Sequence, residues 1–143
     1  MKNTIFLFVL LFSFSSANLF GQARSELNFG LIGVNYEIPV HKDITIAPGA
    51  STNFNLDWLI LNVKANYYFD SLFEIKNNAW DVYGGIGTGY AFYNGDDSKD
   101  SDFDLALHAG GRWFWNDKWG IYVELGGGQT QGATGGLGLT MKL

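Results

Sequence analysis

The stretch FDLALHAGGRWFW, residues 103–115, decides the fold because its side chains alternate with a period of two. Its odd positions are all apolar or glycine, whereas its even positions include Asp104, His108 and Arg112. Successive side chains of a β-strand point to opposite faces of the sheet. This stretch is therefore predicted to be a strand with one apolar face and one face that holds all of its charges.

The same alternation recurs along the chain after residue 24. The turn Asn116-Asp117-Lys118 has three residues, which places Trp115 opposite Trp119 on the apolar face of the next strand. Helices are disfavoured because the chain has 19 glycines and no apolar residues at helical spacing. Seven clear strands are predicted, and they occupy residues 26–38, 44–53, 59–69, 80–94, 103–115, 119–126 and 137–143.

Two of these strands contain an expected irregularity. Between Leu31 and Ile32 the apolar residues switch from odd to even positions, and a bulge within the first strand would restore one apolar face. Pro48 has no N–H to donate, so it predicts an irregularity or a bulge in the second strand.

The first 23 residues are identified as an export signal. Lys2 supplies the positive start, and residues 5–12 (IFLFVLLF) form an apolar run much shorter than the roughly 20 residues of a membrane-spanning helix. Small residues near the end of this segment predict cleavage after Ala23, with Gly21 as the alternative. Residues 1–23 are then the signal peptide, and residues 24–143 form one domain.

Composition excludes several classes of protein. The chain has 143 residues, a formal net charge of −5, 47% hydrophobic and 17% aromatic residues, and only 16% charged residues. The aromatic content excludes a disordered chain, and the acidic balance argues against binding to nucleic acid. The absence of cysteine excludes disulfides, thiolate nucleophiles and Cys-ligated zinc. The surface of the remaining folded domain carries too few charges for a soluble protein.

The strand faces indicate where this surface lies. In a soluble β-sandwich the polar faces meet water, but here those faces carry mostly Gly, Ala, Asn and Tyr. Such residues fit a narrow interior, with the apolar faces turned toward lipid. Because a bilayer excludes open sheet edges, the all-β chain is predicted to close into an antiparallel up-and-down transmembrane barrel.

Four segments stand out in the second half of the chain, and they are YGGIGTGY (83–90), LHAGGRWF (107–114), YVELG (122–126) and GLTMKL (138–143). In these segments the chain resembles the small outer-membrane β-barrel proteins of Gram-negative bacteria. The chain is similar in these segments to the transmembrane domain of outer membrane protein A and to its short stand-alone relatives. The last segment looks like the C-terminal signal read by the barrel-assembly machinery, although it ends in Leu143 where the family has an aromatic residue.

The resemblance implies an even number of strands, with both ends of the chain in the periplasm. It also implies long outer loops, which here would be residues 94–102 and 129–132, and short inner turns such as 116–118. Seven clear strands leave an eighth to be placed. Residues 24–42 have room only for a short and irregular one, unless the barrel is atypical.

Parity also predicts which side chains face the lumen. The charged or titratable residues among them are Glu37, Lys64, Asp81, Asp104, His108, Arg112, Glu124 and Lys142. Arg112 lies opposite Tyr122 and diagonal to Glu124, which predicts an Arg–carboxylate contact. A barrel of eight strands is only wide enough for side chains to fill, so a charge network that plugs the lumen is favoured over a proton or ion path.

Two further groups are expected at the ends of the barrel. The aromatic interface comprises Trp80, Trp113, Trp115 and Trp119. The acidic outer loop comprises Asp96, Asp97, Asp100 and Asp102. This loop is interpreted as solvated and repulsive, and the alternative is a cation bridge to lipopolysaccharide phosphates.

No catalytic, cofactor-binding or metal-binding residue is assigned. Asp104 and His108 lie four residues apart on one strand, about 13 Å, which is too far for a direct catalytic pair. The leading hypothesis is a non-enzymatic integral outer-membrane barrel that contributes to envelope integrity or to surface interactions. Its expected partners are outer-membrane lipid and the barrel-assembly machinery. The alternatives are an exported barrel that binds a small apolar ligand, and a lipid-modifying enzyme with His41 or His108 as its base.

Overall fold

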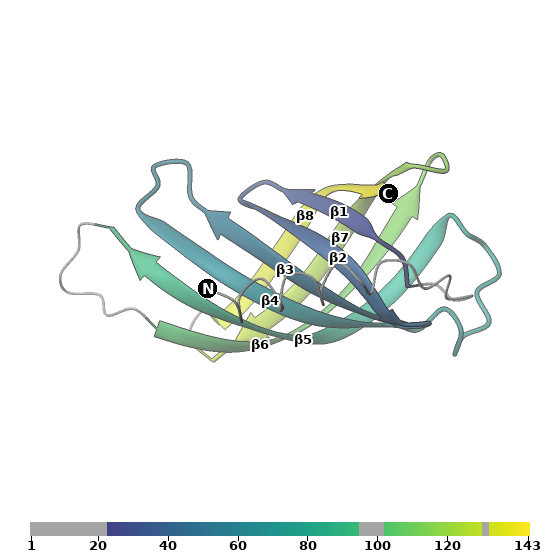
Figure 1. Cartoon of the computed structure of the whole chain (residues 1–143), viewed down its shortest axis with the longest axis horizontal. Coiled ribbons are helices and arrows are strands. Elements are labelled where there is room, and N and C mark those ends of the chain that lie inside the picture. Colours follow the sequence, from purple (N-terminus) through teal and green to yellow (C-terminus); the bar gives the residue numbers. More distant parts are fainter. Residues whose placement is uncertain (1–22, 95–101, 130–131) are drawn as a thin grey trace, which may run out of the picture.

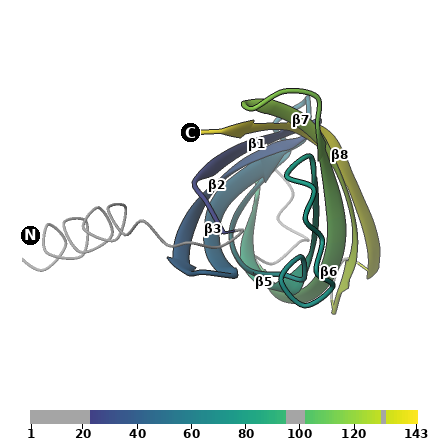
Figure 2. The same ribbon diagram turned by 90° about the vertical axis from the view of Figure 1, so that its right-hand side faces the viewer.

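The chain forms a closed barrel of eight antiparallel strands in sequence order (Figure 1). The computed structural model describes residues 23–94, 102–129 and 132–143. The strands are β1 (Glu26–Gly30), β2 (Gly33–His41), β3 (Ile44–Thr52), β4 (Trp58–Tyr68), β5 (Trp80–Tyr93), β6 (Asp102–Phe114), β7 (Trp119–Gly128) and β8 (Gly132–Lys142). β1 pairs with β8 and closes the barrel, so that the strands curve into a ring in Figure 2. Within the described ranges, no helix is long and apolar enough to cross a membrane.

The predicted first strand is in fact two strands, β1 and β2. Residues 31 and 32 form a two-residue turn between them, and Phe29 pairs with Val34 across this hairpin. The expected bulge at this point is therefore wrong. A bulge and a two-residue turn switch side-chain parity in the same way, which is why alternation alone did not distinguish them. The turn supplies the eighth strand, and β1 is short, with five residues.

A smaller correction concerns the two prolines. Pro48 pairs with Val63 in regular register on its β4 side. On its β2 side the pairing passes from Asn35↔Gly49 to Ile38↔Ile46 and leaves out Pro48, which is the expected irregularity. The register itself shifts only between Pro39 and His41, and β2 continues through residues that were expected to form a turn.

The strand register fixes the tilt of the barrel. A path of paired residues that starts at Trp113 on β6 and crosses every strand returns to β6 at Phe103, ten residues away. Such a stagger requires strands tilted by roughly 35–45° to the barrel axis. With eight strands, the interior is only wide enough for side chains to fill.

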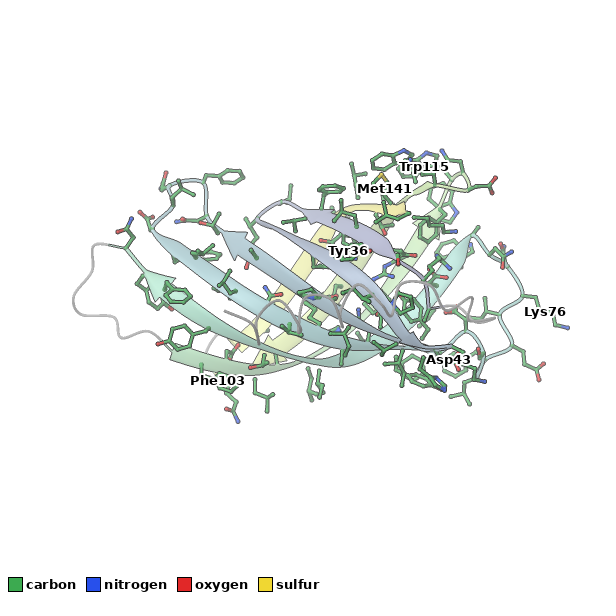
Figure 3. All side chains as sticks on the ribbon, in the orientation of Figure 1. Tyr36, Asp43, Lys76, Phe103, Trp115 and Met141 are labelled. Atoms are coloured by element: carbon green, nitrogen blue, oxygen red, sulfur yellow. The ribbon has the colours of Figure 1, made fainter. Side chains whose placement is uncertain are left out.

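Burial is the reverse of that in a soluble domain. Charged carboxylates and hydroxyl groups dominate the largest fully buried side chains among the described residues. These side chains are Tyr68, Tyr83, Glu26, Glu37, Thr45, Thr140, Asp70 and Asp81. Large aliphatic and aromatic side chains instead cover the outer wall, and Figure 3 shows side chains that project outward from the ribbon of the barrel. Soluble proteins bury Leu, Ile, Val and Phe and almost never bury unpaired Glu or Asp.

The two ends of the barrel differ. The end that holds Ala23 and Leu143, here called the terminal end, also holds the connections 42–43, 69–79 and 115–118. The opposite end, here called the distal end, holds the connections that follow β1, β3, β5 and β7. The resemblance implied short turns beside the chain termini, yet the connection 69–79 is longer than 31–32 and 53–57 at the distal end.

The turn between β6 and β7 keeps the register that the sequence predicted. Phe114 pairs with Gly120, and Trp115 donates from its backbone to the Trp119 carbonyl at 3.2 Å. The Asn116 side-chain oxygen accepts from the backbone N–H groups of Lys118 and Trp119 at 2.8 and 2.7 Å. The side chain of Asn116 thus satisfies the donors that the turn leaves free.

Replacing Asn116 with alanine is expected to lower the free energy of unfolding by about 1–2 kcal/mol, because two backbone donors lose their acceptor. Urea titration of the refolded barrel, followed by tryptophan fluorescence, measures this loss. Asp117→Ala in the same turn is the control and is expected to change stability by less than about 0.5 kcal/mol. Equal losses in the two variants would contradict the role of Asn116.

Candidate functional site: the charged lumen

The terminal half of the lumen is filled by the Arg112 cluster, which consists of Arg112, Glu26, Glu37 and Tyr68. Arg112 Nη1 donates to Glu26 Oε2 at 2.7 Å, and Nη2 forms a short ion pair with Glu37 Oε1. Tyr68 donates from its hydroxyl to Glu37 Oε2 at 2.6 Å and accepts from Arg112. The side chains of Arg112, Glu26 and Glu37 are only 2%, 0% and 1% exposed.

Strand placement explains why these side chains meet. Glu26 and Glu37 face inward from β1 and β2, where they are paired with each other. Arg112 reaches them from β6 and Tyr68 from β4, so four strands contribute to one layer. The Arg112 guanidinium also lies 4.3 Å from the ring centroid of Tyr83 on β5. Charged groups and rings from around the barrel thus close its cross-section.

Neutral side chains complete the hydrogen bonding of the two carboxylates. Thr45 Oγ1 and Asn28 Nδ2 donate to Glu37 at 2.6 and 3.0 Å. Thr140 Oγ1 donates to Glu26 Oε2 at 3.2 Å. A buried ion pair is stable only when its remaining polar atoms find partners, and the lumen supplies many of them.

A second group of charges lies toward the terminal end. Arg24 Nε is 2.6 Å from Glu26 Oε1, and its Nη2 pairs with Asp81. The Phe114 ring lies under two cations, because the Arg24 guanidinium is 4.9 Å and Lys142 Nζ is 3.8 Å from its centroid. This group covers the terminal side of the Arg112 cluster.

A third group lies on the distal side of the cluster. Lys64 forms a short ion pair with Glu124, and Tyr83 donates to Glu124 Oε2 at 3.1 Å. His108 Nε2 is 2.6 Å from the amide oxygen of Asn66. A void of about 10 Å³ between this group and the Arg112 cluster has room for one water molecule.

Beyond Lys64 and Glu124 the lumen opens. A cavity of about 150 Å³ is bordered by Thr88, Asp104 and His108 as well as by these two charges. The lumen is therefore filled in its terminal half and hollow in its distal half.

The structure places all eight predicted lumen residues on the inner face, but it pairs them differently. Arg112 lies opposite Tyr122 as expected, yet its carboxylate partners are Glu26 and Glu37, whereas Glu124 pairs with Lys64. The predicted Arg112–Glu124 contact is thus replaced, because the guanidinium extends across the lumen instead of along its own sheet.

Four contributors were not predicted as lumen residues, and they are Arg24, Glu26, Tyr68 and Tyr83. Glu26 and Asn28 are two residues apart on β1 and therefore lie on the same face. The alternation of β1 could have placed Glu26 in the lumen if β1 had been recognised as a separate strand. Tyr68 and Tyr83 lie on predicted polar faces, where their hydroxyl groups were the available signal. Arg24 lies before β1, where no alternation applies.

The predicted tryptophans gather at the terminal end. The Trp80 and Trp113 rings are 6.3 Å apart, and those of Trp113 and Trp115 are 6.4 Å apart. Trp119 is paired with Met141, and Figure 3 shows Met141 and Trp115 at the same end of the barrel. At the distal ends of β5 and β6, the aromatic residues Tyr90, Phe92 and Phe103 face outward. Two aromatic belts thus border the apolar wall, as in barrels that cross a bilayer.

The acidic loop lies mostly outside the described residues. Asp96, Asp97 and Asp100 fall in the segment that the structure leaves undescribed, and of Asp102 only the backbone pairing with Ala91 is described. Among the described residues, no group of three or more His, Cys, Asp or Glu side chains could hold a metal ion.

The terminal connection 69–79 is anchored to the barrel. Asp70 Oδ1 accepts from the Val82 backbone at 3.2 Å, and Ser71 donates to Asp43 Oδ1 at 2.7 Å. Burial raises the pKa of the Asp70 carboxyl above its usual value. Leu72 and Phe73 remain exposed on this connection, which adds apolar surface to the terminal end.

Three solved structures resemble this barrel. A designed transmembrane β-barrel aligns with a TM-score of 0.60 and 14% identity, over 83% of this chain and 91% of its own. The N-terminal β-barrel domain of Pseudomonas aeruginosa OprF aligns with a TM-score of 0.55 and 13% identity, over 83% and 93%. The Yersinia pestis outer membrane protein Ail, determined in a phospholipid bilayer nanodisc, aligns with 0.53 and 16%, over 85% and 99%.

No family model and no curated protein matches the sequence. The likenesses to solved structures have low sequence identity, so they establish the fold. At that level they confirm the resemblance to small outer-membrane barrels that the sequence indicated. The chain has the fold of a small, eight-stranded transmembrane β-barrel.

Proposed function

We propose that the protein is a non-enzymatic, integral outer-membrane barrel with a charge-plugged lumen. The observation that carries this proposal is the inverted burial, with Glu26, Glu37 and Arg112 enclosed while large apolar side chains cover the outer wall. Such a molecule is stable only where its outer wall is in contact with lipid. Its role is then structural, or it lies in surface interactions through the distal connections, where Phe54 and Leu56 are exposed.

The lumen disfavours the two alternative functions. A small apolar ligand would have to enter a space bordered by Lys64, Glu124 and Asp104. An enzyme based on His108 would need a nucleophile beside it, but its Nε2 is 2.6 Å from the amide oxygen of Asn66. His41, the other candidate base, is exposed at the end of β2.

The signal peptide is part of this proposal, since export precedes insertion. Ala23 is buried, and its backbone N–H donates to the Lys42 carbonyl at 3.0 Å. These contacts favour cleavage after Gly21, which keeps Ala23 in the mature barrel. The barrel-assembly machinery would then recognise β8, which ends beside β1 at the closure of the sheet.

Fractionation of a Gram-negative host is expected to recover the mature protein in the outer membrane. Its gel mobility should change on heating, because the closed barrel migrates as a compact form until it unfolds. Recovery in the soluble periplasmic fraction, without heat-modifiable mobility, would contradict the proposal.

Planar bilayer recordings test the plug. The wild-type barrel and Arg112→Ala are both expected to show no large steady current, since Tyr68, Tyr83, Glu26 and Glu37 still fill the cross-section. Large steady single-channel currents from either protein would refute the plugged lumen.

A further inference from the structure

The wall of the barrel has a notch above the β1–β2 hairpin. β1 pairs with β8 only as far as Gly30 and Gly138, whereas β8 continues through residues 132–137, roughly 20 Å of strand at the usual rise. Figure 1 shows the β1–β2 hairpin ending well short of the β3–β4 hairpin. Within the described chain, this part of β8 therefore pairs with β7 alone.

The notch opens at the level of the apolar wall. On the path of paired residues from Trp113 to Phe103, Val34 is reached after four of the eight steps. Each step along tilted strands climbs by the same amount, so Val34 lies halfway in height between these two aromatic residues. The hairpin tip, residues 31–32, is just above this level, where unpaired backbone groups of β8 would face lipid at a high cost.

Two connected cavities occupy the notch. One, of about 370 Å³, extends from the hairpin and residues 134–137 of β8 to Lys64, Tyr122 and Glu124 in the lumen. The other, of about 300 Å³, is an outer groove that reaches Phe54 and Leu59. Residues 31–34 border both cavities, so the apolar outer groove adjoins the cavity of about 370 Å³. The inner part of that larger cavity, around Lys64, Tyr122 and Glu124, is here called the polar compartment.

The polar compartment has one charge of each sign. Lys64 and Glu124 form an ion pair whose side chains are 25% and 16% exposed, so both remain accessible from the cavity. Their charges cancel, which gives an anionic group no net attraction. A group that carries both signs finds an opposite charge at each end.

We propose that the notch binds one zwitterionic phospholipid. Its phosphate lies beside the Lys64 ammonium and its own ammonium beside the Glu124 carboxylate, while an acyl chain follows the outer groove over Ile32 and Phe54. The phosphate and ester oxygens also provide acceptors for the unpaired amides of β8. This site rests on the proposed function, because only a membrane-inserted barrel presents the notch to lipid.

Native mass spectrometry from an uncharged detergent tests this site. The mature barrel is mixed with phosphatidylethanolamine, phosphatidylglycerol or diacylglycerol of matched acyl chains. Retention of one phosphatidylethanolamine is expected. Phosphatidylglycerol, which lacks the ammonium and so loses one charge-assisted contact, is expected to bind about tenfold more weakly, and diacylglycerol, which lacks both charges, more weakly still.

Gly136→Phe fills the compartment. A Cβ at Gly136 would lie 3.7 Å from the Tyr122 ring and 3.8 Å from Glu124 Cβ, which are ordinary van der Waals contacts, and it would point into the lumen. The matched control is Gly111→Phe on the outward face of β6, where a Cβ meets only the Asp81 carbonyl oxygen at 3.5 Å. Phosphatidylethanolamine binding is expected to weaken about tenfold in the first variant and to stay unchanged in the second.

The double variant Lys64→Gln, Glu124→Gln tests the charges separately from the space. It is expected to bind phosphatidylethanolamine and phosphatidylglycerol equally. Equal binding of both lipids by the wild type, full binding by Gly136→Phe, or a dimer of the chain in place of the lipid adduct would each overturn the proposal. Heat-modifiable mobility of every variant separates loss of this site from failure of the barrel to insert.

Discussion

Arg112→Met is expected to lower the free energy of unfolding by about 3–5 kcal/mol, the cost of leaving buried carboxylates without their cation. Glu37 would then lie fully buried with no cation beside it, and Glu26, also fully buried, would keep only its contact with Arg24. Methionine keeps most of the side-chain volume, so the loss reports on charge and hydrogen bonding more than on a cavity. Urea titration of the barrel refolded in lipid vesicles, followed by tryptophan fluorescence, measures it.

Two comparisons assign this loss to the Arg112 cluster. Adding Glu26→Gln and Glu37→Gln to Arg112→Met is expected to recover most of the stability, because no buried charge is then left unpaired. Lys64→Met breaks the Lys64–Glu124 pair, whose side chains are partly exposed to the distal cavity, and is expected to cost only about 1 kcal/mol. Equal losses from Arg112→Met and Lys64→Met would contradict a sealed lumen.

The wall of the barrel could be predicted from the sequence because parity is a local property. Leu107 and His108 are neighbours in the chain, and a strand must send them to opposite faces. The same reasoning placed Trp115 opposite Trp119, since a three-residue turn leaves one possible register. Because one face was apolar and the other held the charges, the apolar face was predicted to contact lipid and the charged face to line the lumen.

The partners of each lumen charge could not be predicted in this way. Strand pairing identifies neighbours within the sheet, but contacts across the lumen depend on how the sheet closes. Arg112 on β6 meets Glu26 on β1 and Glu37 on β2. These contacts could be predicted only if β1 and β2 were recognised as two strands. A two-residue turn and a bulge gave the same parity, so the sequence showed seven clear strands, left a short eighth strand to be placed within residues 24–42, and left Glu124 as the only evident partner of Arg112.

The inverted burial makes a second large effect testable at the outer wall. Leu107 is 66% exposed and lies on β6 between Phe103 and Trp113, about midway between the two aromatic belts. Leu107→Arg is expected to lower the free energy of unfolding in vesicles by about 2–4 kcal/mol, the cost of a cation on the lipid face near the bilayer midplane. The same substitution on the surface of a soluble protein would change stability by less than about 0.5 kcal/mol.

Ala106→Arg is the matched control, because the neighbouring residue on β6 faces the distal cavity instead of the lipid. That cavity is bordered by polar and charged side chains instead of lipid, so the new side chain is expected to cost less than about 1 kcal/mol. A single step along the strand thus separates a large loss from a small one, and only a barrel with lipid outside and polar groups inside predicts that order. Equal, small effects of the two arginines would mean that water surrounds the wall, and would contradict membrane insertion. A larger loss from Ala106→Arg would mean that the apolar face points inward, as in a barrel that encloses an apolar ligand.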